Sequence, residues 1–281
     1  MDFSFTDEIE GELEKRKICG VALTRKVTVP TAICLLLTLI IGISVGVTKG
    51  GNSSNIVQSS IDIKDPRYEQ FLIKVEPLVG HLIAEEGSPQ NKAFNWLVYD
   101  DNAKLDPEKD SLDEIIQRYA LAAFYRSLRG YNWENKLNFM SYRHVCDWND
   151  QVGGEQYGVS CFDSKRVSKL IMPTNKLNGT LPLDIGLLSG LETLELSENA
   201  IRGTLPHSLG LLTNLITLDV SDNQIRGRLP NTMEKMRSLQ YVYAQRNQLD
   251  GLLGNRMTEC PFLVEFDVSK YRMVHWHFAA S

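Results

Sequence analysis

The side chains whose spacing could support chemistry are few. His275 and His277 would present two imidazoles on one side of an extended segment, as a pair of metal ligands does. No Cys, Asp or Glu stands beside them to complete a zinc site, so solvated tail residues are the simpler interpretation. Ser160 precedes Cys161, yet the chain contains no nucleophile elbow, phosphate-binding loop or metalloprotease motif. The sequence therefore predicts no catalysis, no metal site and no other cofactor.

Composition and charge restrict the class of partner. Apolar residues make up 43% and charged residues 23% of the 281 residues, which are ordinary values for a folding chain. The net charge is −5, and no basic stripe is apparent outside residues 1–26, which themselves hold six acids against five bases. These values argue against a nucleic-acid partner. The five cysteines lack any CxxC spacing and are too few for a disulfide scaffold.

Residues 27–48 are an uncharged apolar run of 22 residues, long enough to cross a membrane as a helix. Five basic residues precede the run and Lys49 alone follows it, so we expect a signal anchor with residues 1–26 in the cytosol. The remainder would then be extracellular or lumenal, in plasma or internal membrane. Two alternatives stay open: a signal peptide cleaved after the small residues Ser44 and Gly46, or a buried core helix.

Residues 49–64 are rich in Gly, Ser and Asn and predict a flexible stalk. Residues 65–130 then show helical periodicity in three stretches and predict a helical lead-in. The first stretch, 65–86, is amphipathic, and Pro77 should kink or split it. Ser88 followed by Pro89 signals the start of the second helix, and Asp110 or Ser111 can cap the third.

A repeat of 24 residues begins at 167 and returns without insertion at 191, 215, 239 and 263. Its ninth position is always asparagine and its thirteenth is always glycine in the first four units. Such a register across several units is very improbable by chance. The recurring residues are Asn175, Asn199, Asn223 and Asn247; Gly179, Gly203, Gly227 and Gly251; and Pro182, Pro206 and Pro230 at position sixteen.

Each unit resembles the plant-type leucine-rich repeat, with the pattern LxxLxLxxNxL followed by GxLP. The resemblance implies an α/β solenoid: a short repeat array with a parallel sheet on its concave face, preceded by the helical region and the transmembrane helix. Side-chain alternation in each strand would turn Leu194 and Leu196 inward. The asparagines would bond backbone groups of adjacent coils that are otherwise buried without partners.

Residues 131–166 resemble the amino-terminal cap of the same family. Trp133 precedes a Cys-x-Trp element at Cys146 and a Gly-Val-x-Cys element that ends at Cys161, with an unusually long segment between them. The resemblance implies a Cys146–Cys161 disulfide. The helical lead-in is also loosely similar to that of membrane-anchored repeat proteins of unicellular algae.

The concave face is the expected binding surface, because solenoids bind partners there. Its fifth repeat position would place Glu195 beside Asp219, and Tyr241 and Tyr243 would follow on the same face. Carboxylates on neighbouring strands, next to tyrosines, favour a partner with a basic or amine group beside an apolar part. The alternative is an ordinary solvated sheet surface, since such residues are common in the repeat family.

Two sequons and one cysteine are left over. Asn178 in the first repeat is a candidate for N-glycosylation, although the repeat pattern alone also explains Gly179 and Thr180. Asn52 would lie too close to the membrane. Cys260 has no obvious mate, which permits a buried thiol or an intermolecular bridge.

The carboxyl-terminal residues 263–281 begin as a fifth repeat and lose its turn residues. Tyr271, His275 and Phe278 stand where asparagine, glycine and proline should be. We expect a strand at about 263–269 and an irregular remainder, whether this is a natural cap or a shortened repeat array.

The expected function is recognition without catalysis. A receptor-like, membrane-anchored repeat protein without a kinase domain would bind a protein, peptide or glycan, and any inward signal would need a partner such as a co-receptor. The alternatives are a structural or adhesive surface glycoprotein, or a secreted inhibitor of extracellular hydrolases.

Overall fold

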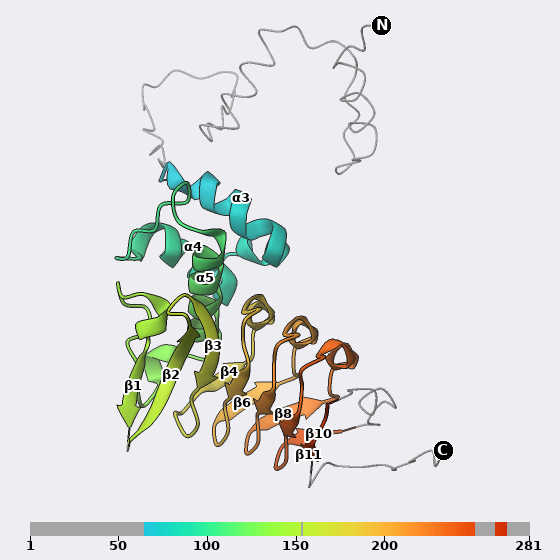
Figure 1. The fold of residues 1–281 in the computed structure, drawn as a ribbon. Coiled ribbons are helices and arrows are strands. Elements are labelled where there is room, and N and C mark those ends of the chain that lie inside the picture. The colour runs from blue at the N-terminus through green and yellow to red at the C-terminus, as the bar shows by residue number, and fades with distance from the viewer. Residues whose placement is uncertain (1–64, 153, 251–261, 269–281) are drawn as a thin grey trace, which may run out of the picture. The chain divides into compact units, whose positions relative to one another are not determined.

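The computed structural model describes residues 65–152, 154–250 and 262–268 (Figure 1). The chain divides into two compact units, Met1–Lys64 and Asp65–Ser281, and all described residues belong to the second. The expected span 27–48 and the stalk therefore lie outside the described residues. Within the described part, no helix is both long enough and apolar enough to cross a membrane.

The helical lead-in is present and its second and third helices are capped as predicted. The Ser88 hydroxyl accepts a hydrogen bond from the Asn91 N–H at 2.9 Å, and the Ser111 hydroxyl accepts one from Glu114 at 3.2 Å. Each serine thus satisfies an amide that the first helical turn leaves unpaired. The elements are α3 (Arg67–Val79), the 3-10 helix η1 (Gly80–Ile83), α4 (Pro89–Asn95), the π-helix η2 (Trp96–Asp100) and α5 (Leu112–Ser127).

Pro77 does not split the first helix, contrary to one form of the prediction. α3 continues through Pro77 and ends at Val79, and Gly80 follows with a φ of 68°. Because Pro77 lies in the last turn, its missing N–H affects a single helical bond. Glycine adopts this left-handed conformation without steric cost and terminates the helix instead.

The cap region forms a short hairpin joined to the first repeat strand. β1 (Asn149–Val152) pairs antiparallel with β2 (Glu155–Phe162), and β2 pairs antiparallel with β3 (Arg166–Ile171). The implied disulfide is present: Cys146 and Cys161 are joined, with their Cα atoms 5.4 Å apart. It links β2 to the 3-10 helix η4 (Val145–Asp147); a second 3-10 helix, η3 (Gly130–Asn132), precedes it.

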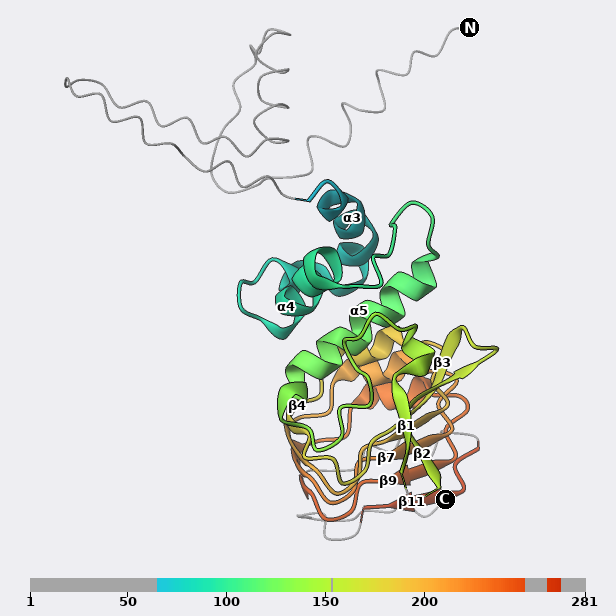
Figure 2. The same cartoon turned by 90° about the vertical axis from the view of Figure 1, so that its left-hand side faces the viewer.

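The predicted parallel sheet runs along the repeats, and Figures 1 and 2 show its strands stacked coil upon coil. Equivalent residues pair at every step, so that Leu170, Leu194, Leu218, Val242 and Phe266 form one row. The first four of these side chains are fully buried, as the alternation predicted. The further strands are β5 (Thr193–Glu195), β7 (Thr217–Asp219), β9 (Tyr241–Tyr243) and β11 (Glu265–Asp267), and the sheet order is β1-β2-β3-β5-β7-β9-β11.

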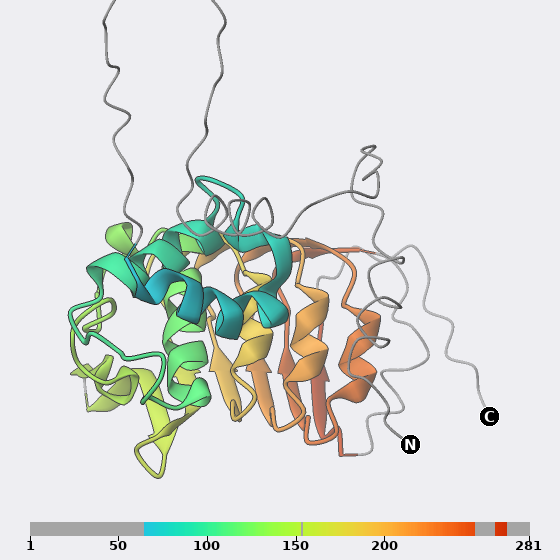
Figure 3. The same ribbon diagram turned by 90° about the horizontal axis from the view of Figure 1, so that it is seen from above.

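A second parallel sheet, which the sequence pattern did not predict, forms the flank of the coils. It contains the residues around the repeated glycine, where only a bend was expected. The strands are β4 (Asn178–Thr180), β6 (Ala200–Gly203), β8 (Gln224–Gly227) and β10 (Gln248–Leu249), in the order β10-β8-β6-β4. Each of the first three coils then closes through a 3-10 helix, η5 (Leu183–Leu187), η6 (His207–Leu211) or η7 (Asn231–Lys235), and Figure 3 shows these side by side.

The repeated asparagines bond adjacent coils, as predicted. The Asn199 amide donates to the Met172 carbonyl of the preceding coil at 2.9 Å, and its oxygen accepts from the Leu177 N–H at 2.9 Å. Asn223 repeats this pattern with Leu196 and Ile201 at 2.9 Å each. The ladder pairs backbone groups that would otherwise be buried without partners.

The helical lead-in and the solenoid share one hydrophobic core. α5 packs against η5 and β3 and crosses the amino-terminal end of the coils (Figure 2). Gly179 lies at a close approach between the two, because a Cβ there would clash with the Ser127 carbonyl. The open end of the first coil is thus covered by the last turn of α5, while the hairpin extends the concave sheet.

Candidate recognition site on the concave face

The sheet register brings the four predicted residues onto three neighbouring strands. Glu195 on β5 pairs with Asp219 on β7, which pairs with Tyr243 on β9. Tyr241 lies two residues before Tyr243 and so on the same face. All four side chains are half-buried, so each keeps some exposed area that a partner could contact. The strands' 24-residue spacing alone accounts for this juxtaposition.

Glu195 is the least compensated of the four. Burial raises the pKa of its carboxyl, and the neighbouring charges of Asp219 and Glu155 raise it further. Glu155 belongs to the cap hairpin on β2 and was not predicted to reach this face. Among the described residues, no ion pair involves any of these three carboxylates. A cation arriving at Glu195 would therefore relieve repulsion that the fold leaves in place.

Asp219 and Tyr243 are already partly engaged within the protein. One Asp219 oxygen accepts hydrogen bonds from the Ser221 N–H at 2.9 Å and the Ser221 hydroxyl at 2.7 Å. The Tyr243 hydroxyl donates to Glu265 at 2.9 Å, and this bond raises the tyrosine pKa. The four predicted residues thus differ. The Asp219 carboxylate already accepts hydrogen bonds from Ser221, whereas the Glu195 carboxylate can still accept hydrogen bonds from a partner.

At the rim of the concave face, side chains at the eighth repeat position bond to one another between adjacent coils. Arg246 binds both carboxylate oxygens of Asp222 across adjacent coils. The Thr174 hydroxyl donates to Glu198 at 3.3 Å on the exposed edge. At the eighth repeat position Arg246 thus pairs the charge of Asp222, whereas Glu198 receives only a hydroxyl. Among the described residues, no ion pair involves Glu195 or Asp219 at the fifth position.

The other predicted sites are placed as follows. Asn178 lies on β4, half-buried, and its N–H donates to the Leu128 carbonyl at 3.3 Å. Its side-chain oxygen is buried with no partner among the described residues, and its glycosylation stays a prediction. His275 and His277 lie outside the described residues. In the described ranges, no group of three or more His, Cys, Asp or Glu side chains could hold a metal ion.

Two buried polar clusters that sequence reasoning missed lie where α5 meets its neighbours. The Arg118 guanidinium binds Asp101 at 2.5 and 2.6 Å and lies between the rings of Trp96 and Trp148. Asp184 in η5 accepts from Gln90 at 2.6 Å and from Tyr119 at 3.0 Å. Both clusters are inaccessible to a ligand and fix the lead-in to the cap and to the first coil. The sequence signal that could have revealed the first cluster is Arg118, a charged residue among the apolar residues of the third predicted helix.

The repeats match a known family. Residues 189–249 match the leucine rich repeat family model. The chain has the leucine-rich-repeat solenoid fold with its parallel sheet. A comparison with curated proteins finds no match.

Several solved structures of plant receptors are similar. The chain is 35% identical to part of the PEPR1–AtPEP1 crystal structure, covering 42% of this chain and 16% of that one, with a TM-score of 0.38. The BIR3–SERK2 complex from Arabidopsis thaliana is 26% identical over 41% of this chain and 63% of that one, with a TM-score of 0.40. The BIR2 ectodomain from Arabidopsis thaliana is 25% identical over 57% of this chain and 81% of that one, with a TM-score of 0.44. The chain thus spans less than two thirds of the first two.

Proposed function

We propose that this protein is a non-catalytic recognition module that binds a protein or peptide through its concave face. The observation that supports this proposal is the row of half-buried carboxylates and tyrosines on β5, β7 and β9, with Glu195 at its amino-terminal end. The carboxylate of Glu195 has acidic neighbours and no internal cation. The partner segment would place a lysine, arginine or amino terminus at Glu195 and an apolar side chain against Tyr241.

The chemistry of the face favours a cationic group with an apolar neighbour. A partner ammonium or guanidinium would replace water at Glu195, where half-burial strengthens the Coulomb attraction relative to bulk solvent. Tyr241 offers a large ring at low conformational cost, which is why tyrosines are frequent anchors at interfaces. The neighbouring Thr193 and Thr217 hydroxyls lie one row away and can complete hydrogen bonds.

A random-peptide display library tests this function and requires no candidate ligand. The full chain in mild detergent is the target, and the enriched peptides are synthesised for titration by fluorescence anisotropy. We expect enrichment of basic residues next to apolar ones. Glu195→Gln should weaken binding about tenfold, because a charge-assisted contact is lost. Asp163→Asn is the matched control, since it removes one exposed carboxylate in the β2–β3 turn, away from this face.

Two results would contradict the proposal. One is enrichment of peptides without any excess of lysine or arginine. The other is an equal affinity for Glu195→Gln, Asp163→Asn and the unaltered chain.

Membrane anchoring through residues 27–48, with the repeats outside the cell or in a lumen, is the second part of the proposal. It is supported by the uncharged run and the basic residues that precede it. Epitope tags at both ends of the chain test it in membrane fractions. The amino-terminal tag should stay with the membrane and resist external protease, while the carboxyl-terminal tag should be digested. Release of the carboxyl-terminal tag into the medium without protease would indicate cleavage instead.

A further inference from the structure

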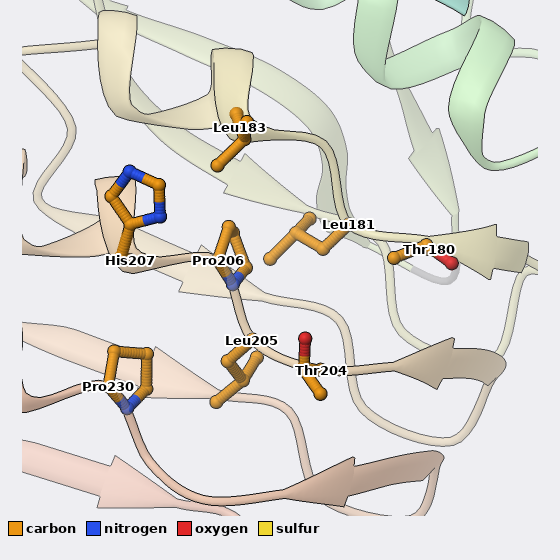
Figure 4. Close-up of a pocket in the computed structure, with 8 residues that line it drawn as sticks. All are labelled: Thr180, Leu181, Leu183, Thr204, Leu205, Pro206, His207 and Pro230. Carbon is orange, nitrogen blue, oxygen red and sulfur yellow. The ribbon is translucent and has the colours of Figure 1, made fainter.

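Two cavities on the described part of the chain differ in the side chains that line them. Figure 4 shows the first, on the flank of the coils, where leucine, proline and threonine side chains and His207 surround a volume of about 380 Å³. The second lies in the amino-terminal cap, and its volume is about 330 Å³. We call it the cap pocket. It is lined by both cysteines of the disulfide, by His144 and Asp147, and by amide and hydroxyl side chains. Of these two cavities, the cap pocket contains a covalent bond that a ligand can exchange.

The disulfide is accessible from the cap pocket. Cys146 in η4 and Cys161 in β2 both line the pocket, and both are half-buried. Thiol–disulfide exchange begins when a thiolate attacks one of the two sulfur atoms, so its rate depends on access to them. A disulfide within the hydrophobic core is closed to that attack, whereas a small thiol can enter a polar cavity of this volume. The geometry therefore permits exchange in the folded protein.

Polar side chains distinguish the surroundings of the two sulfur atoms. Asp147 follows Cys146 directly, lines the pocket and is exposed, so its carboxylate attracts an ammonium group to the Cys146 side. Among the described residues, no ion pair involves Asp147. On the Cys161 side, Ser160 and Ser164 line the pocket, and their hydroxyls can donate hydrogen bonds to a thiolate. An aminothiol bound through Asp147 would thus attack Cys146 and release Cys161.

Hydrogen bonds hold the two cysteines close, independently of the bond between them. The Asn149 side-chain amide donates to the Cys146 carbonyl at 2.6 Å and to the Val159 carbonyl at 2.9 Å. The Val159 N–H donates to the carbonyl of Trp148, a fully buried residue, at 2.9 Å. These hydrogen bonds join the same two segments that the disulfide joins, η4 and β2. Opening the disulfide would therefore leave both cysteines in position to form it again.

We propose that the cap pocket is a site of covalent modification, at which a small aminothiol exchanges with the Cys146–Cys161 disulfide. The aminothiol thiolate attacks the Cys146 sulfur and the bond between the two cysteines breaks. Cys161 leaves as a thiolate and takes up the proton that the aminothiol gave to solvent. One disulfide is thus replaced by another, with no net oxidation or reduction. Attack of Cys161 on the adduct reverses the reaction, whereas attack by a second aminothiol releases the aminothiol disulfide and leaves both cysteines reduced.

Peptide mapping by mass spectrometry tests the position of the adduct. The free thiols of the full chain in mild detergent are first blocked with N-ethylmaleimide, and the excess is removed. The chain is then exposed briefly to cysteamine and treated with iodoacetamide. We expect cysteamine on Cys146 and the carbamidomethyl group on Cys161. An adduct found mainly on Cys161 would overturn the proposal.

The charge of the thiol tests the role of Asp147. Opening rates are measured with cysteamine, neutral 2-mercaptoethanol and anionic 2-mercaptoethanesulfonate. Each rate is divided by the rate of the same thiol with hydroxyethyl disulfide, which cancels intrinsic reactivity. We expect the normalised rates to decrease in that order by about threefold at each step, because Asp147 attracts the first thiol and repels the last. Asp147→Asn should reduce each step to less than about twofold. Asp150→Asn removes another exposed carboxylate from the cap hairpin and is the matched control, which should preserve the steps.

Urea separates exchange in the folded protein from exchange after unfolding. Below the unfolding transition, the opening rate with cysteamine should stay constant within about twofold, because the sulfur atoms are already accessible. A rate that rises with urea in proportion to the unfolded fraction would contradict the proposal, as would equal normalised rates for the three thiols. Glu195→Gln should leave all of these rates unchanged, so the outcome does not depend on the concave-face proposal.

Discussion

Charged side chains occur both on the concave face and at the junction, where α5 packs against the cap and the first coil. The two regions differ in how far the fold pairs those charges. In the junction, Arg118 is 2% exposed and its charge is met by Asp101 and by the carbonyls of Ser141 and Arg143. On the concave face, Glu195 is half-exposed and meets other carboxylates instead. A charge whose bonds are complete inside the protein holds the fold. A charge left incomplete at a surface is available to a partner.

Asp184 at the junction and Glu195 on the concave face both have a raised pKa, and they differ in the same way. Burial is the main cause for both Asp184 and Glu195. The fold supplies Asp184 with two hydrogen bonds, from Gln90 and Tyr119, which partly offset that burial. Glu195 receives a further penalty from Asp219 and Glu155. A raised pKa alone therefore does not identify a binding site. The presence or absence of hydrogen-bond partners inside the protein distinguishes a structural carboxylate from one available to a ligand.

Arg118→Met should have the largest effect on stability. The substitution keeps the apolar contacts between Trp96 and Trp148 but leaves Asp101 buried without its cation, which typically costs about 3–5 kcal/mol. Urea unfolding of the full chain in mild detergent, followed by tryptophan fluorescence, measures the change. Arg237→Met on the exposed surface is the control and should stay within about 0.5 kcal/mol. Equal stability of the two variants would mean that the junction does not depend on this charge.

Loss of the disulfide should rank second. Replacing Cys146 and Cys161 together by serine opens a link between residues 15 apart in sequence, which by the loop-closure relation costs about 3 kcal/mol. The same unfolding measurement applies. Reductant should destabilise the unaltered chain by a similar amount and leave the double variant unchanged. A response of the double variant to reductant would place the effect at another cysteine.

The repeat units were predictable because one short pattern recurs in register. Each repeat strand of the concave sheet and each bonding asparagine could be placed by counting from Asn175. Local capping chemistry predicted the helix start at Ser88 and narrowed the next start to Asp110 or Ser111. These features depend on neighbours in sequence or on an invariant spacing. The positions of Glu195, Asp219, Tyr241 and Tyr243 on one face followed from the same period.

The features that escaped prediction depend on contacts between distant segments. Gln90 and Asp184 are 94 residues apart in sequence, and no local pattern connects them. Glu155 reaches the concave face only because the cap hairpin continues the sheet. The second sheet lacks the alternating apolar pattern that marks a strand, since its strands of two to four residues are too short to show it.

Asp184→Asn tests the junction through pH and should have a moderate effect. The folded pKa of Asp184 is raised above its unfolded value of 3.8, so the folded state binds the proton more tightly. Its contribution to stability is therefore complete below that value and is lost as the pH rises through the folded pKa. The difference in unfolding free energy between the unaltered chain and Asp184→Asn should fall with rising pH, by up to about 1.4 kcal/mol per unit.

Urea titrations of both proteins from pH 4 to pH 8 measure this difference. Taking the difference cancels the other carboxylates, and Tyr119 and Gln90 remain as hydrogen-bonding neighbours in both proteins. A difference that does not vary across the window would show that Asp184 keeps an ordinary pKa. The comparison between the two raised carboxylates would then no longer hold.

Glu195→Gln should have the smallest effect on stability and a clear effect on binding. Because the side chain is half-exposed and solvent screens its repulsion, the unfolding free energy should change by less than about 0.5 kcal/mol. Affinity for the basic peptides selected on the full chain should decline as the pH falls, since protonation removes the charge they contact. The raised pKa places this decline above the pH at which an ordinary glutamate titrates. In Glu195→Gln the decline should disappear and the weak affinity should be nearly constant. If the variant instead unfolds as readily as Arg118→Met, Glu195 is part of the fold and the concave face is not held open for a partner.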